Sequence, residues 1–567
     1  MLWNVRYSNI ELGRDLALAL EKPIKFGQFL VGRGFEDPAQ VRAFIDSDLK
    51  SMPPPATMPG MEKAVEFLLE ARAKGAIIVV SGDYDADGLT ATALLQRVLG
   101  GLGFNVTARI PNRLEEGYGL SKTAVREIYQ TGAGLIITVD SGVSDVEAVM
   151  EAQKLNLPVI ITDHHQLPPD LPEAAAIINP HLGGGWESAP LAGVGVAFML
   201  AWAVRNACLS RGLVSQAPSM VDHLSLVALG TIADLAPLIG PNRTMVQHGL
   251  KFLLASDWPG LTALRRVAKL ENQERVSVRD VGFKLAPRLN AAGRLGSAYP
   301  ALSILTTQDP RQAEELAKHL DSINRQRYES QRILVEEAFE LLEGEIRKES
   351  RTVVLAAEGW PKGLLGLAAS KVAEKSGKPT IMFCLEDGFC VGSGRTAGGF
   401  DLFAALSLIR GYCQAMGGHS QAAGLRVNQD DLEAFKEAFE SAAAEQPLED
   451  CESEILIDLE VALPELEVLF KSFSELEPFG QGNPAPVAVL RKVKVLDAVC
   501  SRGGRLNLRL SDGLNRQNVY GFNLSERLCE IGPVMDVLVV YDNDSSGYDP
   551  GWRLLDFRPP NQEGLNY

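Results

Sequence analysis

The chain has 567 residues, of which 46% are hydrophobic and 22% are charged, and its formal net charge is −17 at pH 7. This length exceeds what one hydrophobic core usually supports, so we expect several domains, and the composition excludes wholesale disorder. The negative charge argues against a protein that coats nucleic acid nonspecifically, because phosphate neutralisation by Lys and Arg dominates such binding. An enzyme that holds cations and has local basic channels remains compatible with it.

The sequence lacks the marks of secreted and membrane proteins. It contains no run of about 18 uninterrupted apolar residues, and its first residues do not combine a basic stretch with an apolar core. The seven cysteines are scattered and show no CxxC spacing, which is typical of reduced thiols. We therefore expect a cytoplasmic protein with no membrane association, no zinc site and no disulfide framework.

The first 309 residues divide into a leading region and a large domain. Residues 1–60 are predicted to be helical and to end in a linker, since the run 52–60 is rich in proline. Residues 61–309 alternate helices with apolar strands, which are expected at 76–80, 105–110, 135–139 and 158–162. Apolar strands that alternate with helices predict an α/β domain with a parallel sheet covered on both faces.

Three further regions follow. Residues 310–348 carry apolar side chains at helical spacing and are predicted to form one long connecting helix, and residues 349–446 are predicted to form a second, smaller α/β domain. Residues 454–567 change to period two, with Leu506 and Leu508 alternating with polar or basic residues. This predicts a small C-terminal β-barrel and tail, whose basic face either binds a phosphate backbone or only solvates an edge.

Acidic and imidazole groups follow three of the predicted parallel strands. In an open parallel sheet, ligands bind beyond the carboxyl ends of the strands, so these side chains are expected to converge. Asp234 follows another apolar segment and completes the set. The residues are Asp83, Asp85 and Asp87 after the first strand, Asp140 after the third, and Asp163, His164 and His165 after the fourth.

Six carboxylates in one cleft repel one another unless cations lie among them. Oxygen ligands with one or two imidazoles suit Mn²⁺ or Mg²⁺ better than zinc, and two such ions can activate water and neutralise a phosphoryl transition state. The run from Asp83 also resembles a calcium loop, but Leu94 stands where that loop requires Glu, and the run follows a strand. Taken singly, Asp140 and Asp234 fit helix caps as well.

Motifs in order along nearly the whole chain resemble those of DHH phosphoesterases, and in particular the RecJ family. The superfamily motifs are GDYDADG at 82–88, PNR at 111–113, GYG at 117–119, VDSG at 139–142 and DHH at 163–165. The RecJ-like motifs are GTIADLAPL at 230–238, PRLNAAGR at 287–294, EGW at 358–360, GSGR at 392–395, GGH at 417–419, AAG at 422–424 and PFGQGNP at 478–484.

This resemblance implies a DHH domain, a DHHA1 domain and a C-terminal OB-fold, with two Mn²⁺ or Mg²⁺ ions. By position it implies the metal ligands Asp85, Asp87, Asp140, His164 and Asp234, with Asp140 bridging the ions. Asp83 is a further candidate, because many relatives have a His where Ser81 stands. The implied catalytic residues are Asp140, His164 and His165, with His165 facing the scissile phosphate. The substrate-binding candidates are His165, Arg288, Asn290, Arg294, Ser393, Arg395, Gly417, Gly418 and His419.

The implied activity is 5′-to-3′ digestion of single-stranded DNA to 5′-mononucleotides in DNA repair and recombination. The resemblance also implies single-strand-binding protein and a RecQ-type helicase as partners, and we expect a monomer. One alternative is a phosphoesterase for short oligonucleotides or cyclic dinucleotides, which would not need the extra β domain. Another is a non-catalytic replication scaffold, which would have no chemical reason to keep mutually repelling carboxylates together.

Overall fold

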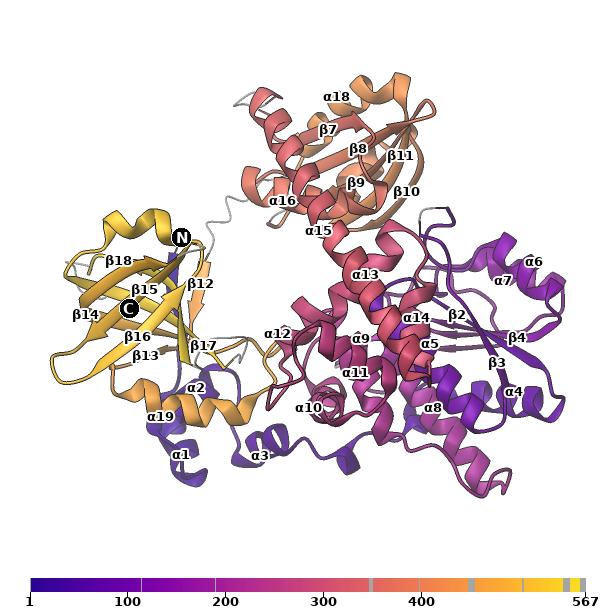
Figure 1. The fold of residues 1–567 in the computed structure, drawn as a ribbon, viewed down its shortest axis with the longest axis horizontal. Helices are drawn as coiled ribbons and strands as arrows, with labels where there is room; N and C mark the ends of the chain where they lie inside the picture. Colours follow the sequence, from indigo (N-terminus) through magenta and orange to yellow (C-terminus); the bar gives the residue numbers. More distant parts are fainter. Residues whose placement is uncertain are drawn as a thin grey trace.

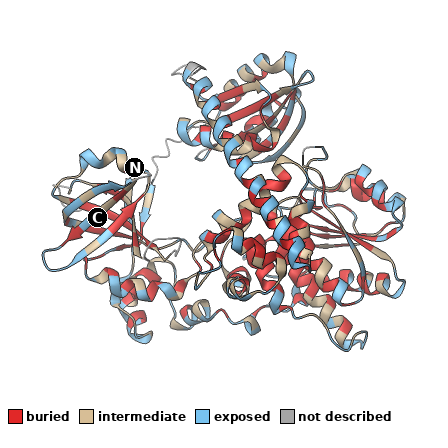
Figure 2. Ribbon diagram, viewed as in Figure 1, coloured by how far each residue is buried: buried red, intermediate tan, exposed pale blue. Residues whose placement is uncertain are grey.

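The computed structural model describes residues 2–113, 115–188, 190–345, 350–396, 398–446, 454–501, 504–543 and 551–560. In Figure 1 these form a large α/β domain on the right, a smaller α/β domain at the top and a β-barrel on the left. We call them the core domain, the small domain and the barrel. Buried residues fill the interior of each one, as Figure 2 shows.

The core domain is built on a parallel sheet, as predicted, with strand order β3-β2-β4-β5-β6. Successive side chains of each strand point to opposite faces, so Ile78 and Val80 join one core and Val79 joins another. Helices α4, α5 and α8 cover the first face, and α6 and α7 cover the second. The bounds are β2 Ile77–Gly82, β3 Asn105–Arg109, β4 Ala133–Val139, β5 Val159–Thr162, β6 Ala176–Ile178, α4 Met61–Ala73, α5 Ala86–Gly101, α6 Lys122–Gln130, α7 Val146–Lys154 and α8 Gly193–Ser210.

Further helices extend the core of the first face. They are α9 Leu224–Ala233, α10 Gly240–Ala255, α11 Pro259–Val267, α12 Val278–Asp280, the π-helix η5 Val281–Leu285, α13 Ala286–Leu295 and α14 Tyr299–Thr306. By length and composition alone α8 could cross a membrane, but 61% of it is buried inside the core domain, as in the central helix of a globular protein.

The small domain has a mixed sheet of order β10-β11-β9-β8-β7, in which β7 and β8 are parallel and the other pairs are antiparallel. Helix α15 joins the two domains because it belongs to both cores: Ala317 packs in the core domain and Ala338 in the small domain. The bounds are α15 Pro310–Glu345, β7 Val353–Glu358, α16 Leu365–Ser376, β8 Thr380–Glu386, β9 Phe389–Arg395, α17 Leu402–Leu408, β10 Cys413–His419, β11 Ala422–Asn428 and α18 Leu432–Ala444.

The C-terminal region forms the predicted barrel. Strand β14 pairs with both β15 and β17, and β16 and β18 close the circuit. Leu506, Leu508 and Leu510 point into its core, as the period-two pattern predicts. The last seven residues of the predicted tail lie outside the described residues. The bounds are β13 Leu459–Glu460, α19 Glu465–Phe473, β14 Val487–Ser501, β15 Arg505–Ser511, β16 Arg516–Gly521, β17 Val534–Asp542 and β18 Gly551–Arg558.

The leading region is not purely helical, contrary to the prediction. Its first strand, β1 (Leu2–Val5), pairs in parallel with β12 (Glu454–Ile457), at the start of the barrel region. Helices α1 (Ile10–Ala19), α2 (Ile24–Gly32) and α3 (Pro38–Asp46) follow, and they share the hydrophobic core of the barrel. A local hydrophobic pattern cannot reveal a strand whose only partner lies at the other end of the chain.

Arg243 on α10 fastens the barrel and the leading region to the core domain. Its guanidinium is 1% exposed and donates to the carbonyl oxygens of Phe44 (2.9 Å), Glu477 (2.9 Å) and Pro478 (3.3 Å). Nearby, the amide of Leu238 donates to the Gln481 carbonyl at 2.7 Å. The segment that holds the barrel in place therefore begins four residues after Asp234, one of the predicted ligands.

Candidate metal centre

The acidic run after β2 forms the start of α5. Asp85 caps this helix, and its Oδ1 accepts from the amides of Asp87 (2.9 Å) and Gly88 (3.2 Å). Asp87 is buried in the first turn, where its carboxylate accepts from the amides of Gly193 (2.7 Å) and Val194 (2.8 Å) at the start of α8. The first amides of a helix have no partner within the helix, so this contact stabilises the buried carboxylate.

Asp140 follows β4 in a left-handed backbone conformation, with φ of 60°. Non-glycine residues adopt this conformation infrequently, and it occurs preferentially at functional sites. A Cβ atom at Gly193 would lie 2.6 Å from Asp140 Oδ1, so the first residue of α8 must be glycine for the carboxylate to occupy its place. Gly193 was not predicted as a site residue, although the two glycines in residues 193–195 are its visible signal.

Asp163 follows β5, and both oxygens of its carboxylate accept hydrogen bonds from the protein. Its Oδ2 accepts from the Val143 amide at 3.0 Å, and its Oδ1 accepts from the amides of His164 (2.7 Å) and His165 (3.1 Å). The same Oδ1 lies 2.7 Å from Nδ1 of His165. Asp163 therefore orients the two histidines and has little capacity left for a metal ion.

The six predicted metal ligands come together where these strands end. Atoms of Asp83, Asp85 and Asp140 lie within 4.8 Å of one another, as do those of Asp87, His164 and Asp234. Nε2 of His164 is 3.0 Å from Oδ1 of Asp140, which connects the two groups. The run from Asp83 leads from a buried strand into a helix, as in the predicted parallel-sheet site and unlike a calcium loop.

The chemistry of these donors fits divalent cations. Among the described residues, no hydrogen-bond partner satisfies the buried atoms Asp83 Oδ1, Asp140 Oδ1 and His164 Nε2. Burial, with the charges of neighbouring carboxylates, raises the pKa of Asp83, Asp87 and Asp140 well above the ordinary value, and that of Asp234 to about 7. Burial lowers the pKa of His164 to about 4, so its imidazole is neutral. Unsatisfied oxygens and a neutral imidazole are the ligands that Mn²⁺ and Mg²⁺ accept.

His165 lies beside this centre, and its imidazole ring is positively charged at neutral pH. Burial lowers the pKa of its ring, but the hydrogen bond and charge of Asp163 outweigh this effect and raise the pKa to about 9. The Tyr118 hydroxyl lies 3.1 Å from Nδ1 of His165 and donates to the Asp140 carbonyl at 2.9 Å. At neutral pH the ring carries a positive charge that suits a phosphate oxygen. The individual role of Tyr118 was missed from the sequence, where it appeared only within its motif.

Four arginines form what we call the cationic cluster, beside the metal centre: Arg113, Arg294, Arg327 and Arg395. The guanidinium of Arg113 lies 4.9 Å from the ring centroid of Tyr84, next to Asp83 and Asp85. Burial and the charges of Arg113 and Arg327 lower the pKa of Arg294 to about 10. Burial and the charge of Arg113 also lower the pKa of Arg395. Cations that repel one another in this way make a site for an anion.

The predicted substrate-binding residues divide into two sets. Arg294 and Arg395 belong to the cationic cluster, and the Ser393 hydroxyl accepts from Arg395 at 3.0 Å. Gly417, Gly418 and His419 lie on β10 at the same end of the sheet, since His419 pairs with Ala422 and Ala422 with Arg395. Arg113 and Arg327 were not predicted as site residues.

Arg288 and Asn290 have other partners. Arg288 is paired with Asp321 at 2.8 Å, which ties α13 to α15, so the prediction that it contacts substrate finds no support in the structure. The Asn290 side-chain oxygen accepts from the Ala86 amide at 2.7 Å and holds the start of α5 in place. Asn290 therefore positions the loop that carries Asp85.

Three family models match the chain in the order of its domains. Residues 77–231 match the DHH family, N-terminal domain; residues 349–445 match the DHHA1 domain; residues 457–549 match the RecJ OB domain. The matched segments correspond to the core domain, the small domain and the barrel.

Characterised proteins and solved structures are similar over most of the chain. The single-stranded-DNA-specific exonuclease RecJ of Escherichia coli is 38% identical over 76% of this chain and 76% of its own length. RecJ of Bacillus subtilis is 34% identical over 93% of this chain, which spans 66% of that protein, slightly less than two thirds. The crystal structure of RecJ in complex with Mn²⁺ from Thermus thermophilus matches with a TM-score of 0.83 at 29% identity, covering 99% of this chain and 80% of its own.

Proposed function

We propose that this chain, which belongs to the RecJ family of DHH phosphoesterases, is a metal-dependent exonuclease that digests single-stranded DNA. It removes 5′-mononucleotides from the 5′ end, in DNA repair and recombination. The RecJ proteins of E. coli and B. subtilis are named as exonucleases specific for this substrate. The observation that carries the proposal is the position of the metal centre next to the cationic cluster.

Asp83, Asp85, Asp87, Asp140, His164 and Asp234 hold the divalent cations, Mn²⁺ or Mg²⁺, with Asp140 shared between them. When bound, such cations neutralise charge on the phosphodiester and lower the pKa of water. The chain supplies the rest. Asp163 keeps His165 protonated and oriented, so that the ring donates to a phosphate oxygen while charge develops there.

The cationic cluster supplies the preference for an end. Arg113, Arg294 and Arg395 bind a terminal 5′-phosphate, which places the first phosphodiester of the strand over the metal centre. Arg395 comes from the small domain and Arg113 from the core domain, so this end of the strand is held between them. Gly417, Gly418 and His419, at the same end of the small-domain sheet, lie along the neighbouring nucleotides.

The barrel supplies the preference for an unpaired strand. A groove of about 560 Å³ on its surface is lined by Arg505, Arg509, Arg516 and Tyr520. Tyr520 is buried beneath Arg505, so the groove offers mainly cationic side chains, which bind the phosphate backbone of a single strand. This favours a long single strand over the short oligonucleotides or cyclic dinucleotides considered above.

We propose the domain limits 61–309 for the DHH domain, 349–446 for the DHHA1 domain and 454–567 for the OB-fold domain, with the helix 310–348 between the first two. Within these limits, residues 114, 189, 346–349, 397, 502–503, 544–550 and 561–567 lie outside the described residues. We place the enzyme in the cytoplasm, which its free cysteines support. It acts as a monomer, with single-strand-binding protein and a RecQ-type helicase as the partners that would supply its substrate.

A 3′-labelled single strand of several tens of nucleotides, incubated with Mn²⁺ or Mg²⁺, tests the activity. We expect progressively shorter labelled strands, and none with EDTA. A 5′-labelled strand should release labelled mononucleotide at once. If only di- to pentanucleotides are cut, the short-substrate alternative replaces this proposal, and binding without cleavage under any metal would favour the scaffold.

A further inference from the structure

We infer that Phe283 is a stacking site for one unpaired nucleobase of the substrate strand, on the way from the barrel groove to the metal centre. The inference rests on the proposed function and adds a residue to it. Phe283 matches none of the motifs described above. Its ring is 71% exposed, whereas Val281 and Leu285 on the same turn are buried.

The backbone around Phe283 is unusual. Residues Val281–Leu285 form a π-helix between α12 and α13, in place of a regular α-helical turn. Such turns are rare and occur frequently at functional sites, because the extra residue projects a side chain that a regular turn would not present. Single exposed hydrophobic residues are common on protein surfaces, so exposure alone does not assign a role. The role is assigned by the position of the ring between the groove and the metal centre.

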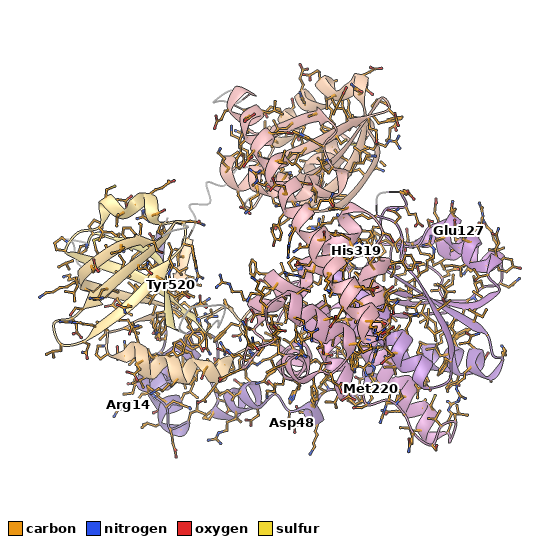
Figure 3. All side chains as sticks on the ribbon, viewed as in Figure 1. Arg14, Asp48, Glu127, Met220, His319 and Tyr520 are labelled. Atoms are coloured by element: carbon orange, nitrogen blue, oxygen red, sulfur yellow. The ribbon has the colours of Figure 1, made fainter. Side chains whose placement is uncertain are left out.

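Toward the barrel, Phe283 is linked to the groove by a short series of contacts. The guanidinium of Arg279 lies 6.0 Å from the Phe283 ring centroid and 3.5 Å from Oδ2 of Asp542 on β17. The Tyr520 hydroxyl donates to the same carboxylate at 3.3 Å. Tyr520, which Figure 3 labels on the barrel, lines the groove together with Arg505. Phe283 therefore lies just across the domain junction from the end of the groove.

Toward the metal centre, the π-helix packs against α9, and Asp234 is the C-cap of that helix. The continuation of the π-helix is α13, whose Asn290 holds the loop of Asp85 and Asp87. The π-helix that carries the ring is therefore in contact with the helix that ends at Asp234, and it continues into the helix that holds the loop of Asp85. A strand that leaves the groove for the metal centre passes this point.

The chemistry matches an unpaired base flanked by phosphates. The Phe283 ring is exposed, the Arg279 guanidinium lies 6.0 Å from its centroid, and the groove beyond carries Arg505, Arg509 and Arg516. Aromatic faces stack with any base, and neighbouring cations bind the backbone, so such a site tolerates every sequence. Because Arg505, Arg509 and Arg516 in the neighbouring groove bind a phosphate backbone, the occupant is a base of the DNA strand.

The test compares single strands that each carry one abasic site, moved one nucleotide at a time from the 5′ end. Affinity is measured in EDTA by fluorescence anisotropy, so that no strand is cut. For the wild-type protein we expect the missing base to weaken binding about tenfold at a position between the nucleotides at the metal centre and those in the groove. Phe283→Ala should bind the intact strand about tenfold more weakly, and the abasic site at that position should then have no further effect.

Two variants make the test specific. Phe283→Trp keeps an aromatic face and should behave like the wild type, whereas Phe403→Ala removes another partly exposed ring, 37% exposed on α17, and should change nothing. Thermal unfolding checks that each variant is folded. The inference is overturned if Phe283→Ala binds like the wild type, or still responds to the abasic site at the same position. A wild type that binds these strands but never cuts them with Mn²⁺ would instead refute the proposed function.

Discussion

The metal centre and the cationic cluster lie next to each other but are assembled in opposite ways. The carboxylates and His164 come from the core domain alone, at the ends of β2, β4, β5 and α9. The arginines come from two domains and the helix between them: Arg113 from a core loop, Arg294 from α13, Arg327 from α15 and Arg395 from β9. The predicted metal ligands can therefore be arranged within one domain, whereas the cationic cluster forms only where the small domain is docked.

Each region is also electrostatically incomplete. The buried acids outnumber the positive charges that face them, and the arginines raise one another's energy. On the proposed function, cations complete the first region and a phosphate completes the second. A substitution that destroys the metal centre should therefore leave phosphate binding by the cationic cluster intact, and the reverse should also hold. The following predictions depend on that independence.

The largest effect is expected from Asp140→Ala. Asp140 belongs to one group of ligands and lies 3.0 Å from His164 of the other, so its removal should lower kcat for single-stranded DNA by about a thousandfold or more. The measurement is the rate of shortening of a 3′-labelled strand at saturating Mn²⁺. Asp430→Ala, which removes an exposed acid in the small domain, is the matched control. An Asp140→Ala enzyme with more than a tenth of the wild-type rate would contradict the shared-ligand role.

A smaller effect, about tenfold to a hundredfold in kcat/KM, is expected from Arg395→Ala on a strand with a 5′-phosphate, since a charge-assisted contact is lost. A strand with a 5′-hydroxyl should show little difference between the two proteins. Arg426→Ala removes another arginine of the same sheet and serves as the control. Equal losses on both strands would mean that Arg395 supports the fold and does not bind the terminal phosphate.

The last effect is on stability. Mn²⁺ binds only the folded centre, so at one hundred times its Kd each bound ion should raise the free energy of unfolding by about 2.7 kcal/mol. Thermal unfolding with Mn²⁺ and with EDTA measures this difference. The shift should persist in Arg395→Ala and vanish in Asp140→Ala, whose metal-free form should be no less stable than the wild type, because one of the repelling carboxylates is gone. A shift lost in both variants would show that the two regions are not independent.

The same contrast explains what the sequence could reveal. Acids that follow parallel strands could be placed together in advance, because the sheet brings every strand end to one edge. Gly193 matters because it lies against Asp140, and Arg113 because it lies near Arg294 and Arg395. Both contacts join segments that are far apart in the sequence, so local patterns could not predict them. The prediction that Arg288 contacts the substrate gained no support, because Arg288 is paired with Asp321. Asp321 lies on α15, and sequence patterns do not place that helix beside α13.

The outer parts of the fold show a similar limit. The barrel was predictable, since Leu506, Leu508 and Leu510 alternate in a way that only a half-exposed strand requires. The strand at the N-terminus was not, because β1 finds its partner in β12. Arg243 could not be distinguished from a surface arginine either, as its three acceptors are backbone carbonyls of remote segments.

The central claim is that a paired metal centre in the core domain works on a strand end held by arginines from both domains. Anomalous diffraction at the manganese edge, from crystals of the unaltered protein with Mn²⁺ and a 5′-phosphorylated trinucleotide that resists hydrolysis, tests it most directly. We expect two manganese peaks, one at Asp83, Asp85 and Asp140 and one at Asp87, His164 and Asp234, with the 5′-phosphate on Arg113, Arg294 and Arg395. Manganese elsewhere, or a phosphate that avoids the cationic cluster, would contradict the account.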